Sequence, residues 1–388
     1  MVISKQRRDF LATLGALAAV PLLSSHAVHA LERASSVATP TRWRGYSNAI
    51  VIDALGGPGA YSDDTSAPLT TTALDDVRAS GITAVNLTVS GVGSYLRDYD
   101  ETIRNVAYWN EQIAAHPDYL LSVRDGADID QAKRSGRLGL IYGFQDATPL
   151  GEDLDRVEMF HELGVRIFQL TYNRRNLVGD GCLEPGNAGL SLFGHALIER
   201  LNARGALIDL AHAGERTTLE AIDASKSPIA ISHTGCAALA AYPRNKTDNE
   251  LKRLADKGGV VGIYLMPFLR THGQPMADDL IRHLEHAVDV CGEDHVGIGS
   301  DGVISPIDAT PEFKRKFADE VSKRRSLGIS APGEQPDVYT FLPDLNSADR
   351  FGRIAGLLSR HGHSDARIGK LIGGNFNRLF REIWRATT

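Results

Sequence analysis

The feature that most constrains this chain is a regular alternation of short apolar runs with amphipathic stretches between about residues 49 and 302. Each apolar run has the length of a strand, and the stretches between them have the spacing of amphipathic helices. Continuous apolar strands are buried on both faces, and strand–helix alternation predicts a parallel sheet. The predicted strands lie at 49–55, 82–90, 138–146, 165–172, 206–212, 228–235, 259–267 and 295–302.

Eight such strands over roughly 250 residues match the count and size of a (β/α)8 barrel, so we predict an α/β fold of the TIM-barrel type. An open, doubly wound sheet is the alternative. It would require a glycine-rich phosphate turn that leads directly into a helix after the first strand. The segment DALGGPGAYS supplies the glycines, but no helical pattern follows at once. The barrel is therefore the preferred prediction.

The N-terminal residues have the layout of a twin-arginine export signal. Arg7 and Arg8 precede a short apolar stretch, which ends in small residues at Ala30. This pattern predicts a signal peptide over 1–30, a linker over 31–48, and a folded mature protein that is exported to the periplasm. An uncleaved anchor is the alternative, although the apolar stretch is short for a membrane span. We expect no membrane span after signal cleavage.

The barrel domain is predicted to cover 49–388. The segment 303–346, which follows the last predicted strand, is charged and then rich in Gly and Pro, so we expect a long loop over one rim of the barrel. The region 347–385 has a helical pattern. The net charge is −6 at pH 7, and the sequence has no basic patch with interleaved aromatic residues. Nucleic acid is therefore not an expected partner.

Polar residues end several of the predicted strands, where a barrel places its chemistry. They are Gln145, Tyr172, His212, His233 and Asp301. A lone histidine on an apolar strand is more often a satisfied core residue than a ligand. Two histidines at the same level of adjacent strands, with an aspartate beyond them, instead favour a site that holds one divalent metal ion.

Six segments of the chain resemble the membrane (renal-type) dipeptidase family, peptidase family M19. They occur in order along most of the chain after about residue 48: GDGCLEPGNAGLSLFG, LNARGALIDLAHAG, SPIAISHTG, RNKTDNELKRLADKGGVVGI, HVGIGSDG and IGKLIGGNFNRLF. The resemblance implies a metal-dependent hydrolase barrel, which agrees with the strand count. It also implies a dipeptide-like substrate with a carboxylate, and a possible homodimer.

The resemblance assigns roles to individual residues. The family uses two zinc ions that are bridged by a glutamate. His212 and His233 match the two histidines that bind one of these ions, and Asp301 matches an aspartate near the catalytic water. Arg244, in the segment YPRNKT, matches an arginine that holds the substrate carboxylate.

The chain departs from the family pattern where the other zinc ion would bind. The first-strand motif D-G-H-N-D stands as DALGG at 53–57, so Leu55 and Gly57 replace both ligands of that ion. Gln145 replaces the bridging glutamate, and Tyr172 replaces a substrate-contacting histidine. Asp146 is on the opposite strand face from Gln145 and is not expected to substitute for the glutamate. Too few carboxylates are left to offset the charge of two divalent cations. We therefore predict that the site binds one metal ion, with zinc as the first choice, or no metal ion.

Three functions are compatible with these residues. A mononuclear metalloenzyme acting on a peptide or amino-acid-derived molecule would hold its ion with the two histidines and with Asp301 or Gln145. A metal-free enzyme would use the same groups and Tyr172 for an isomerisation or elimination on a peptide-like metabolite, such as a siderophore precursor. A non-catalytic peptide-binding protein would keep the pocket and Arg244 alone.

The predicted site residues are therefore of three kinds. We expect the catalytic residues to be Asp301, Tyr172 and Gln145. We expect the metal ligands to be His212 and His233. We expect the substrate to contact Arg244 and Tyr172.

Overall fold

The computed structural model describes residues 43–59, 67–92, 98–328 and 330–384. The predicted signal peptide and most of the predicted linker lie outside these residues. Within the described part of the chain, no helix combines the length and the apolar character that crossing a bilayer requires.

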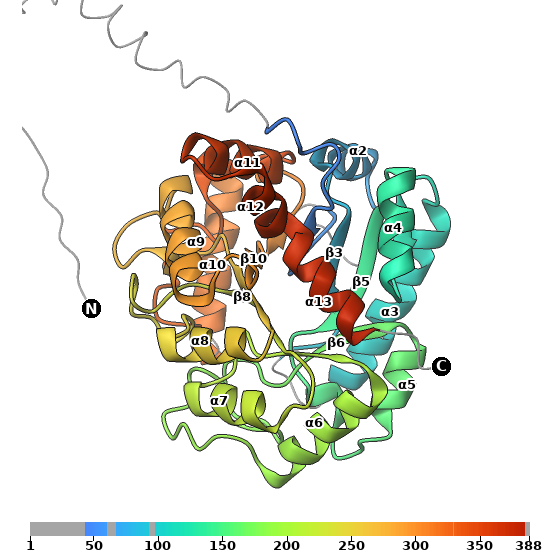
Figure 1. Ribbon diagram of the computed structural model, residues 1–388, viewed down its shortest axis with the longest axis vertical. Coiled ribbons are helices and arrows are strands. Elements are labelled where there is room, and N and C mark those ends of the chain that lie inside the picture. Colours follow the sequence, from blue (N-terminus) through green and yellow to red (C-terminus); the bar gives the residue numbers. More distant parts are fainter. Residues whose placement is uncertain (1–42, 60–66, 93–97, 329, 385–388) are drawn as a thin grey trace, which may run out of the picture. The chain divides into compact units, whose positions relative to one another are not determined.

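Eight parallel strands form a nearly closed barrel with helices around it (Figure 1). The strands are β1 (Ile52–Asp53), β3 (Ala84–Thr88), β5 (Leu138–Phe144), β6 (Val165–Gln169), β7 (Leu207–Asp209), β8 (Ala230–Thr234), β9 (Val260–Ile263) and β10 (Val296–Ile298), in that spatial order. Each lies inside a predicted run, and the predicted barrel is confirmed. One further strand, β4 (Leu120–Ser122), pairs with β5 and was not predicted.

The first and last strands of the barrel meet at their carboxyl ends. The Ala54 N–H donates a hydrogen bond of 2.9 Å to the carbonyl oxygen of Ile298. Beyond this contact, β2 (Gly56–Gly57) pairs in parallel with β11 (Gly302–Val303). The pairing fixes Asp301, the residue before β11, beside the segment that follows β1.

The helices begin and end where local sequence signals place them. For example, the Thr247 hydroxyl and the Glu250 carboxylate form a reciprocal capping box at the start of α8. The helices are α2 (Thr71–Ser80), α3 (Asp98–Ala115), α4 (Gly126–Ser135), α5 (Arg156–Glu162), α6 (Leu192–Arg204), α7 (Glu215–Ala224), α8 (Asp248–Asp256), α9 (Ala277–Cys291), α10 (Pro311–Ser326), α11 (Arg350–Arg360), α12 (Asp365–Gly369) and α13 (Asn375–Ile383).

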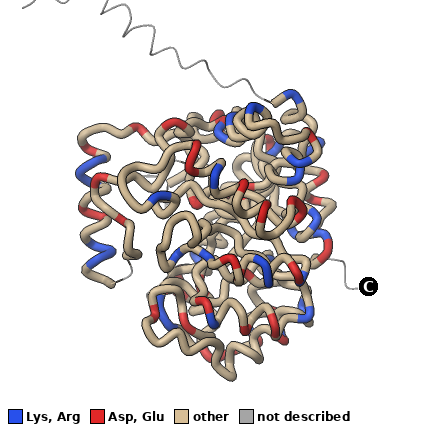
Figure 2. The backbone as a smooth tube through the Cα atoms, turned by 60° about the vertical axis from the view of Figure 1, so that its left-hand side comes forward, with Lys and Arg blue, Asp and Glu red and all other residues tan. Residues whose placement is uncertain are grey.

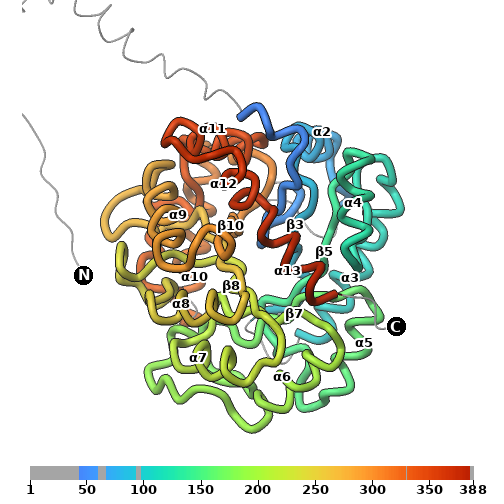
Figure 3. Tube along the Cα trace, viewed as in Figure 1, coloured from blue at the N-terminus to red at the C-terminus, as the bar shows by residue number. Residues whose placement is uncertain are grey.

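Helix α13 covers one end of the barrel, as its path across the strands in Figure 3 shows. Its buried residues Phe376 and Phe380 belong to one apolar cluster with side chains from the strands, such as Ile141 and Ile167. Apolar side chains therefore fill this end of the barrel. The polar residues that were predicted at the carboxyl ends of the strands lie at the opposite end.

The segment 303–346 differs from the predicted loop because it contains the 16-residue helix α10. The Thr310 hydroxyl caps this helix by accepting a hydrogen bond of 3.1 Å from the Phe313 N–H. Only Phe317 and Val321 of α10 are buried, and most of its other side chains are charged. Such a sparse apolar stripe explains why the sequence did not reveal the helix. Over the rest of the described chain, acidic and basic residues are also interspersed, as Figure 2 shows.

Candidate active site

The register of the central strands aligns three aromatic rings at the open end of the barrel. Asp209 on β7 pairs with Gln169 on β6 and with Ala230 on β8. Gln169, Asp209 and Ala230 therefore lie at one level of the barrel. Three positions further along each segment stand Tyr172, His212 and His233. The Tyr172 and His212 rings stack with centroids 4.2 Å apart, and the His212 and His233 rings meet edge to face at 5.0 Å. The structure thus brings these predicted site residues together.

The two histidines direct their Nε2 atoms at each other across 3.0 Å. His212 Nδ1 lies 2.6 Å from Asn173 Oδ1, and because a carbonyl oxygen only accepts, the ring proton is on Nδ1. The Ser232 hydroxyl donates to Asp209 at 2.5 Å and therefore accepts from His233 Nδ1 at 2.7 Å. Both Nε2 atoms consequently present lone pairs to one shared point.

A cation bound by both Nε2 atoms would lie to one side of the line that joins them, because the midpoint is only about 1.5 Å from each atom and a Zn–N bond is about 2.0 Å long. Burial, reinforced by the charge of Arg244, holds the pKa of both His212 and His233 well below the usual value, so both imidazoles are neutral. Two facing lone pairs repel each other unless a cation lies between them. Metal-binding histidines are oriented in the same way, by an acceptor on the other ring nitrogen. In the described residues, no group of three or more His, Cys, Asp or Glu side chains is placed to hold a metal ion.

Asp301 stands next to the histidine pair, with its Oδ2 atom 4.0 Å from His233 Nε2. Its φ of 54° is in the left-handed region, which is uncommon for a residue with a side chain. Burial raises the pKa of Asp301 to about 6, against the lowering effect of nearby arginines and of a hydrogen bond with Gln145. A carboxylate that titrates near neutrality is suited to proton transfer.

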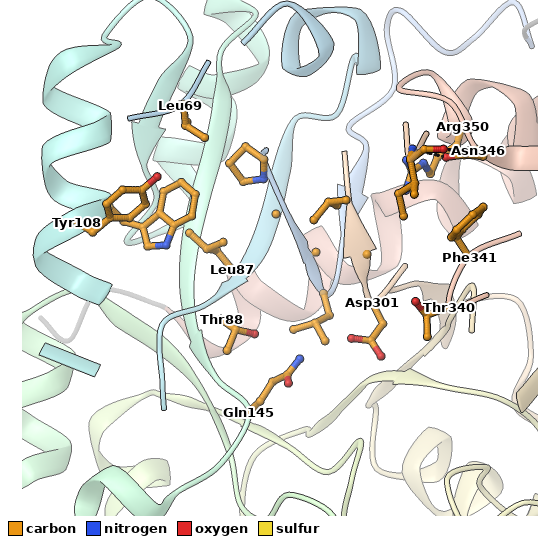
Figure 4. Close-up of a pocket in the computed structure, with 18 residues that line it drawn as sticks. Leu69, Leu87, Thr88, Tyr108, Gln145, Asp301, Thr340, Phe341, Asn346 and Arg350 are labelled. Atoms are coloured by element: carbon orange, nitrogen blue, oxygen red, sulfur yellow. Dashed lines mark hydrogen bonds between the residues drawn. The ribbon is translucent and has the colours of Figure 1, made fainter. Parts of the chain in front are cut away.

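On the other side of the site, the residues that the structure describes provide no cluster of ligands for a second ion. Leu55, Gly57 and Gln145 line a cavity of about 360 Å³ whose walls are largely apolar (Figure 4). Asp53 is buried, and its carboxylate accepts hydrogen bonds from the Ser300 N–H (2.7 Å) and the Ser300 hydroxyl (2.5 Å). The residues present therefore do not fit the two-zinc centre of the family.

Helix α10 contributes a residue to the site that the sequence did not indicate. The Arg324 side chain forms a hydrogen bond with Tyr172 and a bidentate ion pair with Glu334, with N–O distances of 2.9 and 3.0 Å. These three residues border a second cavity, of about 220 Å³. Asp301 and Thr340 line both cavities, so the two cavities adjoin each other at these two residues.

Arg244 does not line either cavity, although its charge acts on Asp301, which lines both. It is buried, its Nη1 atom donates to the Ala211 carbonyl at 2.5 Å, and its guanidinium carbon lies 5.8 Å from the centre of the Tyr264 ring. Its role in substrate binding stays a prediction. Asp146 is also buried, accepts a hydrogen bond of 2.9 Å from Asn176, and lines neither cavity.

Sequence analysis missed the residues that orient the histidines: Asn173, Asp209 and Ser232. A signal for two of them was present, because Asp209 and Ser232 lie in the same apolar runs of the sequence, 206–212 and 228–235, as His212 and His233. A carboxylate or hydroxyl close to a ligand histidine is a common supporting partner. Arg324 had no such signal, since it lies more than a hundred residues from Tyr172 in sequence.

The model of the membrane dipeptidase family, peptidase family M19, matches residues 62–323. The chain belongs to this family. Dipeptidase tcpJ of Claviceps purpurea is 27% identical over 287 residues, which cover 73% of this chain and 60% of that protein. The chain spans between 52% and 60% of the length of tcpJ and two further curated relatives. Dipeptidases of the family are metal-dependent.

Solved structures share the barrel. An amidohydrolase from Pseudomonas aeruginosa superposes with a TM-score of 0.74 at 32% identity, covering 87% of this chain and 98% of that one. A metallo peptidase from Rhodobacter sphaeroides, solved with a phosphinate mimic of the dipeptide L-Ala-D-Ala, has a TM-score of 0.69 at 18% identity and covers 87% of this chain and 100% of that one. The second likeness concerns the fold alone.

Proposed function

We propose that this member of the dipeptidase family is a periplasmic hydrolase of peptide or amino-acid-derived small molecules, and that it binds one divalent metal ion, preferably zinc, at His212 and His233. The observation that carries the proposal is the pair of Nε2 atoms, 3.0 Å apart, whose ring protons are held on the opposite nitrogens by Asn173 and Ser232. Support for a peptide-like substrate comes from the family and from its dipeptidase members.

The charges of the site support one ion rather than two. Neutral imidazoles bind one divalent ion, and Asp301 is the carboxylate beside them. Leu55, Gly57 and Gln145 offer no negative charge on the other side of the cavity. An ion held by the histidines would supply Lewis-acid polarisation of a substrate carbonyl.

The chain's own groups provide the proton transfers. Asp301, whose pKa is about 6, accepts a proton from the attacking water and returns it to the leaving amine. Burial raises the pKa of Tyr172, so its hydroxyl stays protonated and can donate a hydrogen bond to the substrate in the cavity that it lines. The hydrogen bond from Arg324 holds this hydroxyl in place.

The periplasmic location rests on the twin-arginine pattern at Arg7 and Arg8. Cell fractionation tests it directly. Replacement of both arginines by lysine should leave the protein in the cytoplasm, and unchanged export of that variant would contradict the proposal.

Metal content tests the central claim. Wild-type protein should contain one equivalent of metal by elemental analysis, and the His212→Ala/His233→Ala variant should contain none and lose its turnover of dipeptides. His361→Ala/His363→Ala is a matched control, since these two histidines both contact Glu285 near the surface. Two equivalents in the wild type would overturn the single-ion proposal, and peptide turnover by metal-free protein would favour the metal-free enzyme instead.

A further inference from the structure

We propose that Arg350 binds the carboxylate of the substrate at the far side of the 360 Å³ cavity, and that the opposite wall of this cavity takes a bulky apolar group of the same substrate. The inference rests on the proposed function for the reacting end and adds the substrate class to it. The substrate would be a carboxylic acid with a large apolar side chain, rather than a small, fully polar dipeptide.

The cavity has three distinct sides. Figure 4 shows Arg350 and Asn346 on one side, Tyr108 and Leu69 on the other, and Asp301 with Gln145 between and below them. The apolar lining consists mainly of Leu55, Leu69, Leu87, Tyr108, Trp109 and Phe341. A ligand whose reacting bond lies near Asp301 can therefore extend toward a cation and toward an aromatic wall.

Arg350 is a buried cation whose hydrogen-bond acceptors carry no formal charge. The residue is 7% exposed, and its side chain donates to the backbone carbonyls of Ser347 (2.9 Å) and Ile304 (3.0 Å). Within the described part of the chain, no carboxylate lies within ion-pair distance of its guanidinium, and Asp53 and Asp76 act on it only at longer range. A buried charge without a partner is costly, so an anion in the adjoining cavity would stabilise it.

The nearer surroundings reinforce this preference for an anion. Both oxygens of the Asp53 carboxylate already accept hydrogen bonds from Ser300. Arg350 is also the first residue of α11, where the helix dipole adds positive potential. Arg244, by contrast, lines neither cavity and donates to the backbone at Ala211. Among the described residues, Arg350 is thus the cation that lines the 360 Å³ cavity.

Ligand binding to the full chain tests the proposal. The probes are Gly-D-Phe, its C-terminal amide and Gly-D-Ala, with affinities measured by titration calorimetry. Wild-type protein should bind Gly-D-Phe about tenfold more tightly than the amide, because a charge-assisted hydrogen bond to the carboxylate is lost in the amide. Gly-D-Ala should bind about tenfold more weakly than Gly-D-Phe, because it leaves the aromatic wall empty.

Variants of the chain test whether Arg350 causes the preference for the acid over the amide. Arg350→Gln should remove the preference for the acid over the amide, whereas Arg353→Gln, on the same helix and paired with Asp349, should keep it. Arg350→Lys retains the charge and should keep part of the preference. Thermal unfolding of each variant checks that it is folded. If Arg350→Gln does not fold, the preference for the acid is measured instead in Arg350→Lys, and in Arg350→Ala with and without added guanidinium.

Four outcomes would overturn the inference. The wild type could bind acid and amide equally well, or it could fail to bind the acid. The preference for the acid could be unchanged in Arg350→Gln, or it could be lost in Arg244→Gln alone.

The proposed function is tested separately from the carboxylate site. If Gly-D-Phe binds through Arg350 but is never hydrolysed, the carboxylate site stands and the hydrolase does not. If acid and amide are hydrolysed equally well, the hydrolase stands and the carboxylate site does not.

Discussion

The two sides of the active site differ in how their side chains are held. On the side of β7 and β8, His212 and His233 are each oriented by a polar partner, and their Nε2 atoms converge. On the side of β1 and β5, Leu55 and Gln145 face a cavity with apolar walls. Among the described residues, two imidazoles thus converge on one side of the site, and apolar side chains and an amide face the cavity on the other.

This contrast shows that the barrel does not depend on its metal ligands. The strands are fixed by parallel pairing and by apolar clusters, including the one beneath α13. Residues at the strand ends can therefore change from charged to apolar without a change of fold. The cavity on the side of β1 and β5 is correspondingly lined mainly by apolar side chains.

The largest expected effect on turnover comes from replacing Asp301, whose carboxylate lies between the two sides of the site. Asp301→Asn should lower kcat by about a hundred- to ten-thousandfold, because it removes the group that accepts and returns the proton. Metal content should stay as in the wild type, since the two histidines are intact. Steady-state kinetics with Gly-D-Phe provide the measurement, and a variant with full turnover would show that Asp301 is not the base.

An intermediate effect is expected for a residue that orients the histidine side. Asn173→Ala should weaken metal binding by about ten- to a hundredfold, because His212 Nδ1 loses its acceptor. Asn173→Asp keeps an acceptor of the same shape and should bind metal as well as the wild type does. Competition with a chromophoric chelator measures both. Equal affinity in all three proteins would mean that Asn173 does not orient the histidine for metal binding.

The smallest change is expected from restoring the apolar side to the family pattern. The triple variant Leu55→His/Gly57→Asp/Gln145→Glu should bind two metal ions instead of one, by elemental analysis. A Cβ at Gly57 would lie 3.0 Å from Leu87 Cδ1, so adding Leu87→Val relieves that contact. Gln145→Glu alone should still bind one ion. If the triple variant binds only one, the side chains named here are not sufficient to build the second site.

Much of this architecture could be predicted from local sequence pattern. The eight barrel strands follow from their apolar runs, and the row at Tyr172, His212 and His233 follows from the parallel register. Strand β4 was missed because only its first two residues, Leu120 and Leu121, are apolar, which is too short a run to indicate a strand. The roles of Arg324 and Arg350 could not be predicted, since each depends on contacts between segments that are far apart in the sequence.

The pairing that joins the ends of the barrel has a consequence for its synthesis. The hydrogen bonds between Asp53 and Ser300 span 247 residues, and the β2–β11 pair lies next to them. While the ribosome is still translating the C-terminal third, β1 has no partner on its outer side and the growing sheet has an open edge. Contacts of such long range form late in folding, so chains released before β10 should expose that edge and aggregate.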